Sequence, residues 1–87
     1  MFDWDIANVR HIALHGVTRR EAEEVFRDDP TDAIEQNEDG EIRFYQVGLT
    51  EALRCLVVVT TWRKEKLRVV TAYQASRSLQ KSYFAER

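Results

Sequence analysis

The stretch "RCLVVVTTWRKEKLRVVTAY", residues 54–73, decides the fold. It opens with an apolar, β-branched run at 54–62, which is typical of a buried strand. The charged tetrapeptide "RKEK" at 63–66 predicts a turn, and "LRVVTAY" at 67–73 returns as a second strand. Two strands joined by so short a turn pair antiparallel, and we therefore expect a β-hairpin here.

A second hairpin is indicated upstream of this one. "IRFYQVGL" at 42–49 alternates like a strand. Its alternation places four side chains on one face: Arg43, Tyr45, Val47 and Leu49. Asp39-Gly40, just before it, suits a tight turn whose residues need positive φ. Residues 31–37 could then pair as a strand or remain a loop, because their apolar content is low.

Two helices are expected near the N-terminus, over residues 6–15 and 18–26. Asp5 can cap the first helix by accepting a backbone N–H bond. Thr18 and Glu21 form a capping-box pattern that opens the second. The predicted inward faces consist of Ile6, Val9 and Ala13 in the first helix and of Ala22, Val25 and Phe26 in the second.

The remaining elements complete an α+β order. Phe2 and Trp4 alternate with acidic residues, which suits a short strand, and a C-terminal helix is expected over 74–86 with Ala75, Leu79 and Tyr83 in one stripe. Helices segregated to one side of an antiparallel meander predict an α+β sandwich. We expect a single domain, 1–87, with an antiparallel sheet of three to five strands, two N-terminal helices and one C-terminal helix.

Composition restricts the class of protein. The 87 residues carry a formal net charge of −2, which hides an asymmetry. Residues 1–41 hold 4 Lys/Arg against 12 Asp/Glu, a charge of −8, whereas residues 42–87 hold 9 against 3, a charge of +6. The basic half could bind a polyanion or an acidic partner, or the two halves could neutralise each other.

Targeting and redox signals are few. Cys55 stands alone, which excludes an internal disulfide, and its apolar surroundings favour a buried thiol over a reactive one. No segment approaches the roughly 18–20 apolar residues of a membrane span. The acidic N-terminus differs from a secretory signal, so we expect a cytoplasmic protein without membrane contact.

His11 and His15 are spaced i, i+4 and could offer two metal ligands from one helix face. No third ligand follows at a recognisable spacing, so we expect neither a metal nor another cofactor. His15 could instead favour the helix C-terminus electrostatically or act as an acid or base.

A cationic cluster lies at the turn of the first hairpin. Arg63, Lys64, Lys66 and Arg68 occur within six residues, between Trp62 and Tyr73. Cations interleaved with aromatic rings suit RNA, because arginine binds phosphate and rings stack on unpaired bases. The alternative is a charged hairpin tip that keeps the sheet soluble and its edge unpaired.

These motifs together resemble the BrnT family of type II toxins. The segments that carry the resemblance are "FDWD" at 2–5, Asn8, "HGVTRREAEEVFRDDP" at 15–30, "DGEIRFYQVGL" at 39–49, "LVVVTTWR" at 56–63 and "LRVVTA" at 67–72 before a helix that contains Tyr83. They cover essentially the whole chain in the family's order and spacing. The resemblance implies a RelE-like fold and a ribonuclease that arrests translation.

The resemblance also implies partners and a mechanism. The expected partners are the RNA substrate and a cognate ribbon-helix-helix antitoxin similar to BrnA, with operator DNA bound only through the antitoxin. The chain would form a homodimer or a hetero-oligomer with the antitoxin. Cleavage would need no metal, because the RNA 2′-hydroxyl attacks the adjacent phosphorus while the protein binds phosphate and transfers protons.

Carried onto this sequence, the resemblance suggests two sets of site residues. The expected catalytic residues are His15 as proton carrier, Arg63 and Arg68 on phosphate, and Tyr73 at the end of the last strand. The expected RNA-binding residues are Arg43, Trp62, Lys64, Lys66 and Arg77.

Two departures from the family pattern leave an alternative function. Leu14 stands where the family has a lysine before the His-Gly pair, and Tyr73 replaces an arginine near the end of the last strand. Tyrosine has a hydroxyl but no charge at neutral pH. The alternative is therefore a BrnT-like binding module that retains the antitoxin-docking surface but has weak activity or none.

Overall fold

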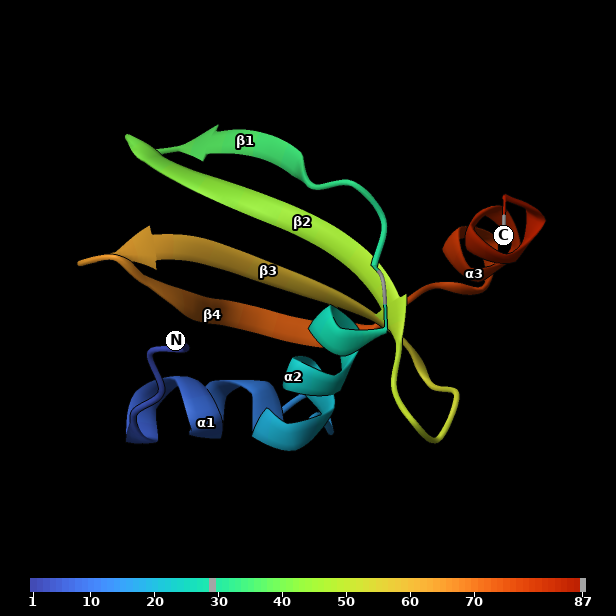
Figure 1. The fold of residues 1–87 in the computed structure, drawn as a ribbon, viewed down its shortest axis with the longest axis horizontal. Coiled ribbons are helices and arrows are strands. Elements are labelled where there is room, and N and C mark those ends of the chain that lie inside the picture. Colours follow the sequence, from blue (N-terminus) through green and yellow to red (C-terminus); the bar gives the residue numbers. More distant parts are fainter. Residues whose placement is uncertain (29, 87) are drawn as a thin grey trace.

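A computed structural model describes residues 1–28 and 30–86 (Figure 1). The elements in chain order are α1 (Ile6–Ala13), α2 (Arg19–Arg27), β1 (Ile34–Glu38), β2 (Glu41–Leu49), β3 (Cys55–Arg63), β4 (Lys66–Gln74) and α3 (Arg77–Ala85). The strands form one antiparallel sheet in the order β1-β2-β3-β4. The predicted α+β fold is confirmed, and the undecided segment 31–37 contributes most of an edge strand.

Both predicted hairpins form, and their turns show why. Asp39 and Gly40 have φ values of 54° and 86°, which matches the turn that joins β1 and β2. Lys64 and Glu65 adopt φ values of 50° and 66° in the β3–β4 turn although neither is glycine. Left-handed backbone costs such residues about 1 kcal/mol each, which the long β3–β4 pairing offsets.

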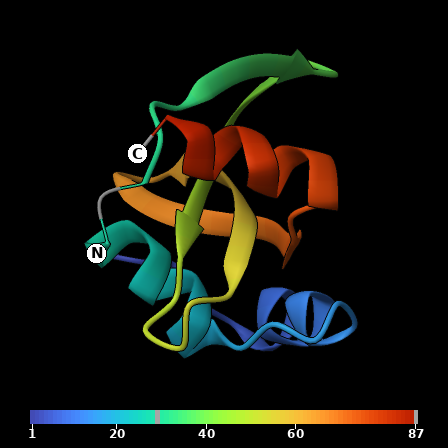
Figure 2. The same ribbon diagram turned by 90° about the vertical axis from the view of Figure 1, so that its right-hand side faces the viewer.

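The central strand β3 separates two apolar cores. On one face, residues of α1, α2 and their connection pack on the sheet. This core consists of Ile12, Val17, Ala22, Val25, Leu56, Val58, Val69 and Ala72. On the other face lie Cys55, Val57, Val59, Ala75 and Tyr83. Figures 1 and 2 show α3 well apart from α1, which lies next to β4, and from α2, which lies against β2 and β3. The prediction that the helices lie on one side of the sheet is therefore wrong, because Tyr83 of α3 packs with Val57 and Val59 on the other face.

Helix α1 differs from its prediction in length and in its inward face. It ends at Ala13 rather than residue 15, and it buries Asn8 and Ile12 while Ile6 is 69% exposed. The predicted cap at Asp5 is confirmed, and Asn8 completes a capping box by accepting a bond from the Asp5 amide at 2.8 Å. This cap fixes the rotation of the helix, so that a polar residue faces the sheet.

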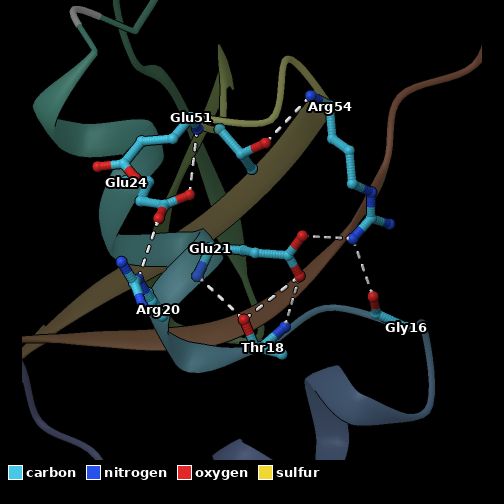
Figure 3. A network of polar contacts seen from close by, with 8 residues as sticks. Gly16, Thr18, Arg20, Glu21, Glu24, Glu51 and Arg54 are labelled. Atoms are coloured by element: carbon cyan, nitrogen blue, oxygen red, sulfur yellow. Dashed lines mark hydrogen bonds and ion pairs between the residues drawn. The ribbon is translucent and has the colours of Figure 1, made fainter.

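The connection between α1 and α2 is tied to the β2–β3 loop by polar contacts (Figure 3). The predicted capping box is confirmed: Thr18 Oγ1 accepts from the Glu21 amide at 3.1 Å, and Glu21 Oε1 accepts from the Thr18 amide at 3.0 Å. Arg54 Nη1 lies 2.7 Å from Glu21 Oε2 and donates to Gly16 O at 3.0 Å. Burial favours the neutral form of Glu21, but Thr18 and Arg54 outweigh it and lower the pKa of this carboxyl.

Helix α2 packs directly on the sheet. Its buried Glu24 accepts a bond from the Glu51 amide at 3.1 Å, and Arg20 Nε lies 3.3 Å from the same carboxylate (Figure 3). A Cβ at Gly48 would lie 2.8 Å from Val25 Cγ1, so only glycine fits between β2 and α2 without movement. The predicted inward residues of α2 are accordingly buried or half-buried.

The secondary-structure elements at the two ends of the chain are shorter than the sequence predicts. Phe2 makes a single parallel bridge to Leu67 instead of a strand. Helix α3 begins after Ser76, whose Oγ accepts from the Leu79 amide at 3.1 Å, because Gln74 is still paired in β4. Tyr83 is the buried residue of α3, whereas Leu79 is 36% exposed.

Candidate functional site

Helix α1 runs parallel to the edge strand β4, which brings its histidines beside the sheet. At its start Arg68 Nη2 donates to Asp5 Oδ1 at 3.2 Å, and one turn later Asn8 Nδ2 donates to Val69 O at 3.3 Å. At its end the rings of His15 and Tyr73 lie with centroids 6.3 Å apart. Successive residues of α1 therefore contact successive residues of β4 in the same chain direction.

A cleft of about 240 Å³ lies between α1 and the sheet, and we name it the α1–β4 cleft. His11 lines it from α1, Arg43 from β2, Arg63 from β3 and Arg68 from β4. Strand register explains why the arginines gather. Thr61 pairs with Arg68, and Phe44 pairs with Thr60, so Arg43 lies one position along beside Thr61 in the same row.

Beyond His11, which lines the cleft, the rings of His15 and Tyr73 follow in a row beside α1. The ring centroids of His11 and His15 are 5.6 Å apart, and Tyr73 follows His15. Both imidazoles are exposed. The imidazole of His11 therefore lies in the same cleft as three guanidinium groups, an arrangement that can combine proton transfer with phosphate binding.

Arg68 is largely neutralised by the N-terminal segment. Its Nη1 lies 3.0 Å from Asp5 Oδ2 and 3.5 Å from Asp3 Oδ2, and its side chain is only 14% exposed. The Asp5 hydrogen bond raises the pKa of Arg68, and the same bond lowers the pKa of Asp5. Arg68 therefore fixes the position of α1 as well as lining the cleft.

The other two arginines of the cleft differ in their partners. Arg43 Nε lies 2.8 Å from Glu41 Oε1, and this hydrogen bond raises the pKa of Arg43. Arg63 is exposed and forms no ion pair within residues 1–28 and 30–86. Arg63 is thus the cleft arginine with its full charge available to a phosphate.

The predicted site residues separate into three groups. Arg43, Arg63 and Arg68 line the cleft, whereas His15 and Tyr73 are not part of its lining and connect to it through the ring of His11. Lys64 and Lys66 lie at the hairpin tip, in a hollow of about 510 Å³ that they share with Arg63. The last two lie elsewhere: Trp62 lines another groove, on the opposite face from Arg63, and Arg77 is exposed in the first turn of α3.

His11 is a cleft residue that the sequence reasoning did not assign to catalysis. Its spacing from His15 was a usable signal, because i and i+4 side chains lie on one helix face.

In the described part of the chain no three His, Cys, Asp or Glu side chains gather as a metal site. None of the helices over those residues has the length and apolarity to cross a bilayer.

Comparison with known proteins identifies the family. A family model described as "Ribonuclease toxin, BrnT, of type II toxin-antitoxin system" matches residues 4–78. No curated protein matches the chain. The matched segment contains α1, α2, the whole sheet and the first residues of α3, and therefore every residue of the α1–β4 cleft. The chain belongs to the BrnT family of ribonuclease toxins of type II toxin–antitoxin systems.

Proposed function

We propose that this toxin cuts RNA in the α1–β4 cleft without a metal ion and thereby arrests translation in the cytoplasm. One observation carries the proposal: Arg63, which forms no ion pair in the described structure, shares the cleft with His11, and the ring of His15 lies 5.6 Å from that of His11. Phosphate binding and proton transfer are the two functions that such a reaction needs from the protein.

The reaction uses a nucleophile that RNA itself supplies. The 2′-hydroxyl oxygen attacks the adjacent phosphorus as it loses its proton, and the bond from phosphorus to the 5′-oxygen breaks. The leaving oxygen takes up a proton, so the products are a 2′,3′-cyclic phosphate and a 5′-hydroxyl. The protein therefore contributes one base, one acid and positive charge against the extra negative charge on phosphorus.

Each part of this chemistry has a candidate residue. His11 and His15 serve as the base and the acid, because imidazole transfers protons effectively near neutral pH. Arg63 stabilises the phosphorane charge. Tyr73 packs against the His15 ring and orients it. Arg68, held by Asp3 and Asp5, positions α1 and borders the scissile phosphate.

Residues outside the reacting centre hold the flanking RNA. Lys64 and Lys66 lie at the hairpin tip next to Arg63, where a further phosphate can bind. Arg43 extends the cationic row across the sheet, although Glu41 shares its charge. Such contacts contribute affinity that falls as salt concentration rises.

The antitoxin is the protein partner that a type II toxin–antitoxin system implies. We infer that it is a ribbon-helix-helix protein of the BrnA type that neutralises the toxin by binding it tightly. Operator DNA would then be bound by the antitoxin rather than by this chain. The assembly would be a hetero-oligomer of toxin and antitoxin.

A second candidate function is a binding module with little or no activity. It is favoured by the carboxylates that compete for Arg68 and Arg43, and by the uncharged Tyr73 beside His15. In that case the chain would bind the antitoxin with the same fold and leave RNA uncut.

RNA cleavage in EDTA distinguishes the two functions. The substrate is purified cellular RNA, and the proteins are the wild type, Arg63→Ala, His11→Ala and His15→Ala. Arg10→Ala is the matched control, because Arg10 is exposed on the same helix but lines a different hollow. We expect each cleft variant to lose at least about 100-fold in rate and the control to lose none. Equal rates for wild type and cleft variants would refute the assignment, and no cleavage by folded wild type would favour the binding module.

A further inference from the structure

One end of the sheet carries a groove with both polar and apolar lining on the face opposite the α1–β4 cleft. The groove has a volume of about 600 Å³, and we name it the Trp62 groove. Its apolar lining consists of Ile42 and Phe44 from β2 and Trp62 from β3. Trp62 is 60% exposed and Ile42 is 38% exposed.

Strand register creates this patch. Phe44 pairs with Thr60, so Ile42 and Trp62, each two positions further along, come opposite one another on the same face. Trp62 in turn pairs with Leu67 of β4. Because successive side chains alternate, Trp62 and Arg63 point to opposite faces of the sheet.

The groove has no covering element among the described residues. Helices α1 and α2 cover the other end of the same face, around Leu56 and Val58, and the tip of the β1–β2 hairpin has no helix beside it (Figure 1). Exposed Trp62 and Ile42 form an apolar patch with half-buried Phe44, and such patches typically mark protein-binding sites. Tryptophan in particular contributes much of the binding energy in protein interfaces.

The charge at the groove indicates the chemistry of its occupant. Glu35 and Glu41 are the charged residues that line it. Glu41 is paired with Arg43, whereas Glu35 forms no ion pair within residues 1–28 and 30–86. A carboxylate repels RNA phosphate and attracts lysine or arginine. The groove therefore fits an apolar protein segment with a basic side chain at its edge.

We propose that the antitoxin anchors in the Trp62 groove with an apolar segment flanked by a lysine or arginine. The proposal deepens the proposed function, since it rests on an antitoxin that neutralises this toxin. Glu41 and Thr61 border both the groove and the α1–β4 cleft. A chain anchored on Trp62 therefore needs only to pass the end of the sheet to cover Arg63.

Two measurements on the same variants test the proposal: the Kd of the complex with the antitoxin encoded beside the toxin gene, and RNA cleavage by the free toxin. The variants are Trp62→Ala, Glu35→Lys and Trp62→Phe, which retains an aromatic ring. Phe84→Ala is the matched control, because Phe84 is an aromatic residue 52% exposed on α3. Circular dichroism establishes that each variant is folded.

We expect Trp62→Ala to raise the Kd at least about 30-fold. Glu35→Lys should raise it about 10-fold, whereas Trp62→Phe and the control should change it less than about threefold. RNA cleavage by free Glu35→Lys should stay within about twofold of wild type, because Glu35 does not line the α1–β4 cleft. If Trp62→Ala loses antitoxin binding while the wild type cuts no RNA, the result would support the antitoxin site in the Trp62 groove and refute the proposed ribonuclease activity.

Three results would overturn the proposal. The first is an unchanged Kd for Trp62→Ala and Glu35→Lys. The second is reduced RNA cleavage by Trp62→Ala with an unchanged Kd, which would assign Trp62 to the RNA surface. The third is a toxin dimer that Trp62→Ala converts to a monomer at unchanged antitoxin affinity, which would assign the groove to a second copy of the chain.

Discussion

Asn8 provides a sharp test of how α1 is held against the sheet. Its side chain is 4% exposed and makes three hydrogen bonds. The amide donates to Asp3 O at 2.9 Å and to Val69 O at 3.3 Å, and Oδ1 accepts from the Asp5 amide at 2.8 Å. Replacing Asn8 by alanine removes all three bonds and leaves buried polar atoms without their partners.

The expected cost follows from these bonds. Each hydrogen bond contributes about 1 kcal/mol net, and unpaired buried groups add to the loss. We expect Asn8→Ala to lower the free energy of unfolding by about 2–4 kcal/mol. For a domain of this size each kcal/mol corresponds to about 4–8 °C in Tm, so Tm should fall by roughly 10–25 °C.

Urea and thermal unfolding measure this effect, with Asn37→Ala as the matched control. Asn37 is exposed and accepts one bond, from the Gly40 amide at 3.0 Å, so its loss should cost less than about 1 kcal/mol. RNA cleavage below the unfolding transition should also fall in Asn8→Ala, because α1 carries His11 and His15. An Asn8→Ala protein as stable as Asn37→Ala would refute this account of α1.

Three further outcomes are expected. Gly48→Ala should lower stability by about 1–3 kcal/mol in urea unfolding, because its Cβ would lie 2.8 Å from Val25 Cγ1; unchanged stability would contradict the close packing of α2 on β2. The lowered pKa of Glu21 means that its carboxyl binds protons more weakly in the folded protein than in the unfolded chain. The ionised carboxyl therefore stabilises the fold fully at pH values above its pKa in the unfolded chain, and this stabilisation is lost as pH falls through its pKa in the folded protein. Arg54→Met should therefore flatten the loss of stability between about pH 5 and 3, and an unchanged slope would exclude this ion pair as the cause. Burial raises the pKa of Cys55, so its thiol should react with a disulfide reagent only at the rate of unfolding; rapid labelling of native protein would show that Cys55 is accessible.

Local signals made much of the fold predictable. The capping box of Thr18 and Glu21 and the turn at Asp39-Gly40 depend on residues within three positions of each other. Strand β3 was recognisable because it is buried on both faces and therefore continuously apolar. The inward face of α1 was not recognisable from the sequence, because it depends on a hydrogen bond from Asn8 to the carbonyl of Val69, 61 residues away.

The candidate site was also predictable only in part, because it too depends on contacts between residues far apart in the sequence. The arginines and lysines of the β3–β4 hairpin could be read as a cationic cluster, and the structure brings Arg63 to the cleft. The sequence did not show that Asp3 and Asp5 neutralise Arg68, because those ion pairs join residues more than 60 positions apart. The opposite orientation of Trp62 could have been inferred from strand alternation alone.

The chemical nature of the RNA ends tests the central claim most directly. Wild-type toxin is incubated with RNA in EDTA, and the 3′ ends of the fragments are analysed by mass spectrometry, with His11→Ala measured beside it. The account predicts 2′,3′-cyclic phosphate ends from wild type and about 100-fold fewer from His11→Ala. Fragments that carry 5′-phosphate and 3′-hydroxyl ends would show that water rather than the RNA 2′-hydroxyl attacks, and would contradict the metal-free mechanism in the α1–β4 cleft.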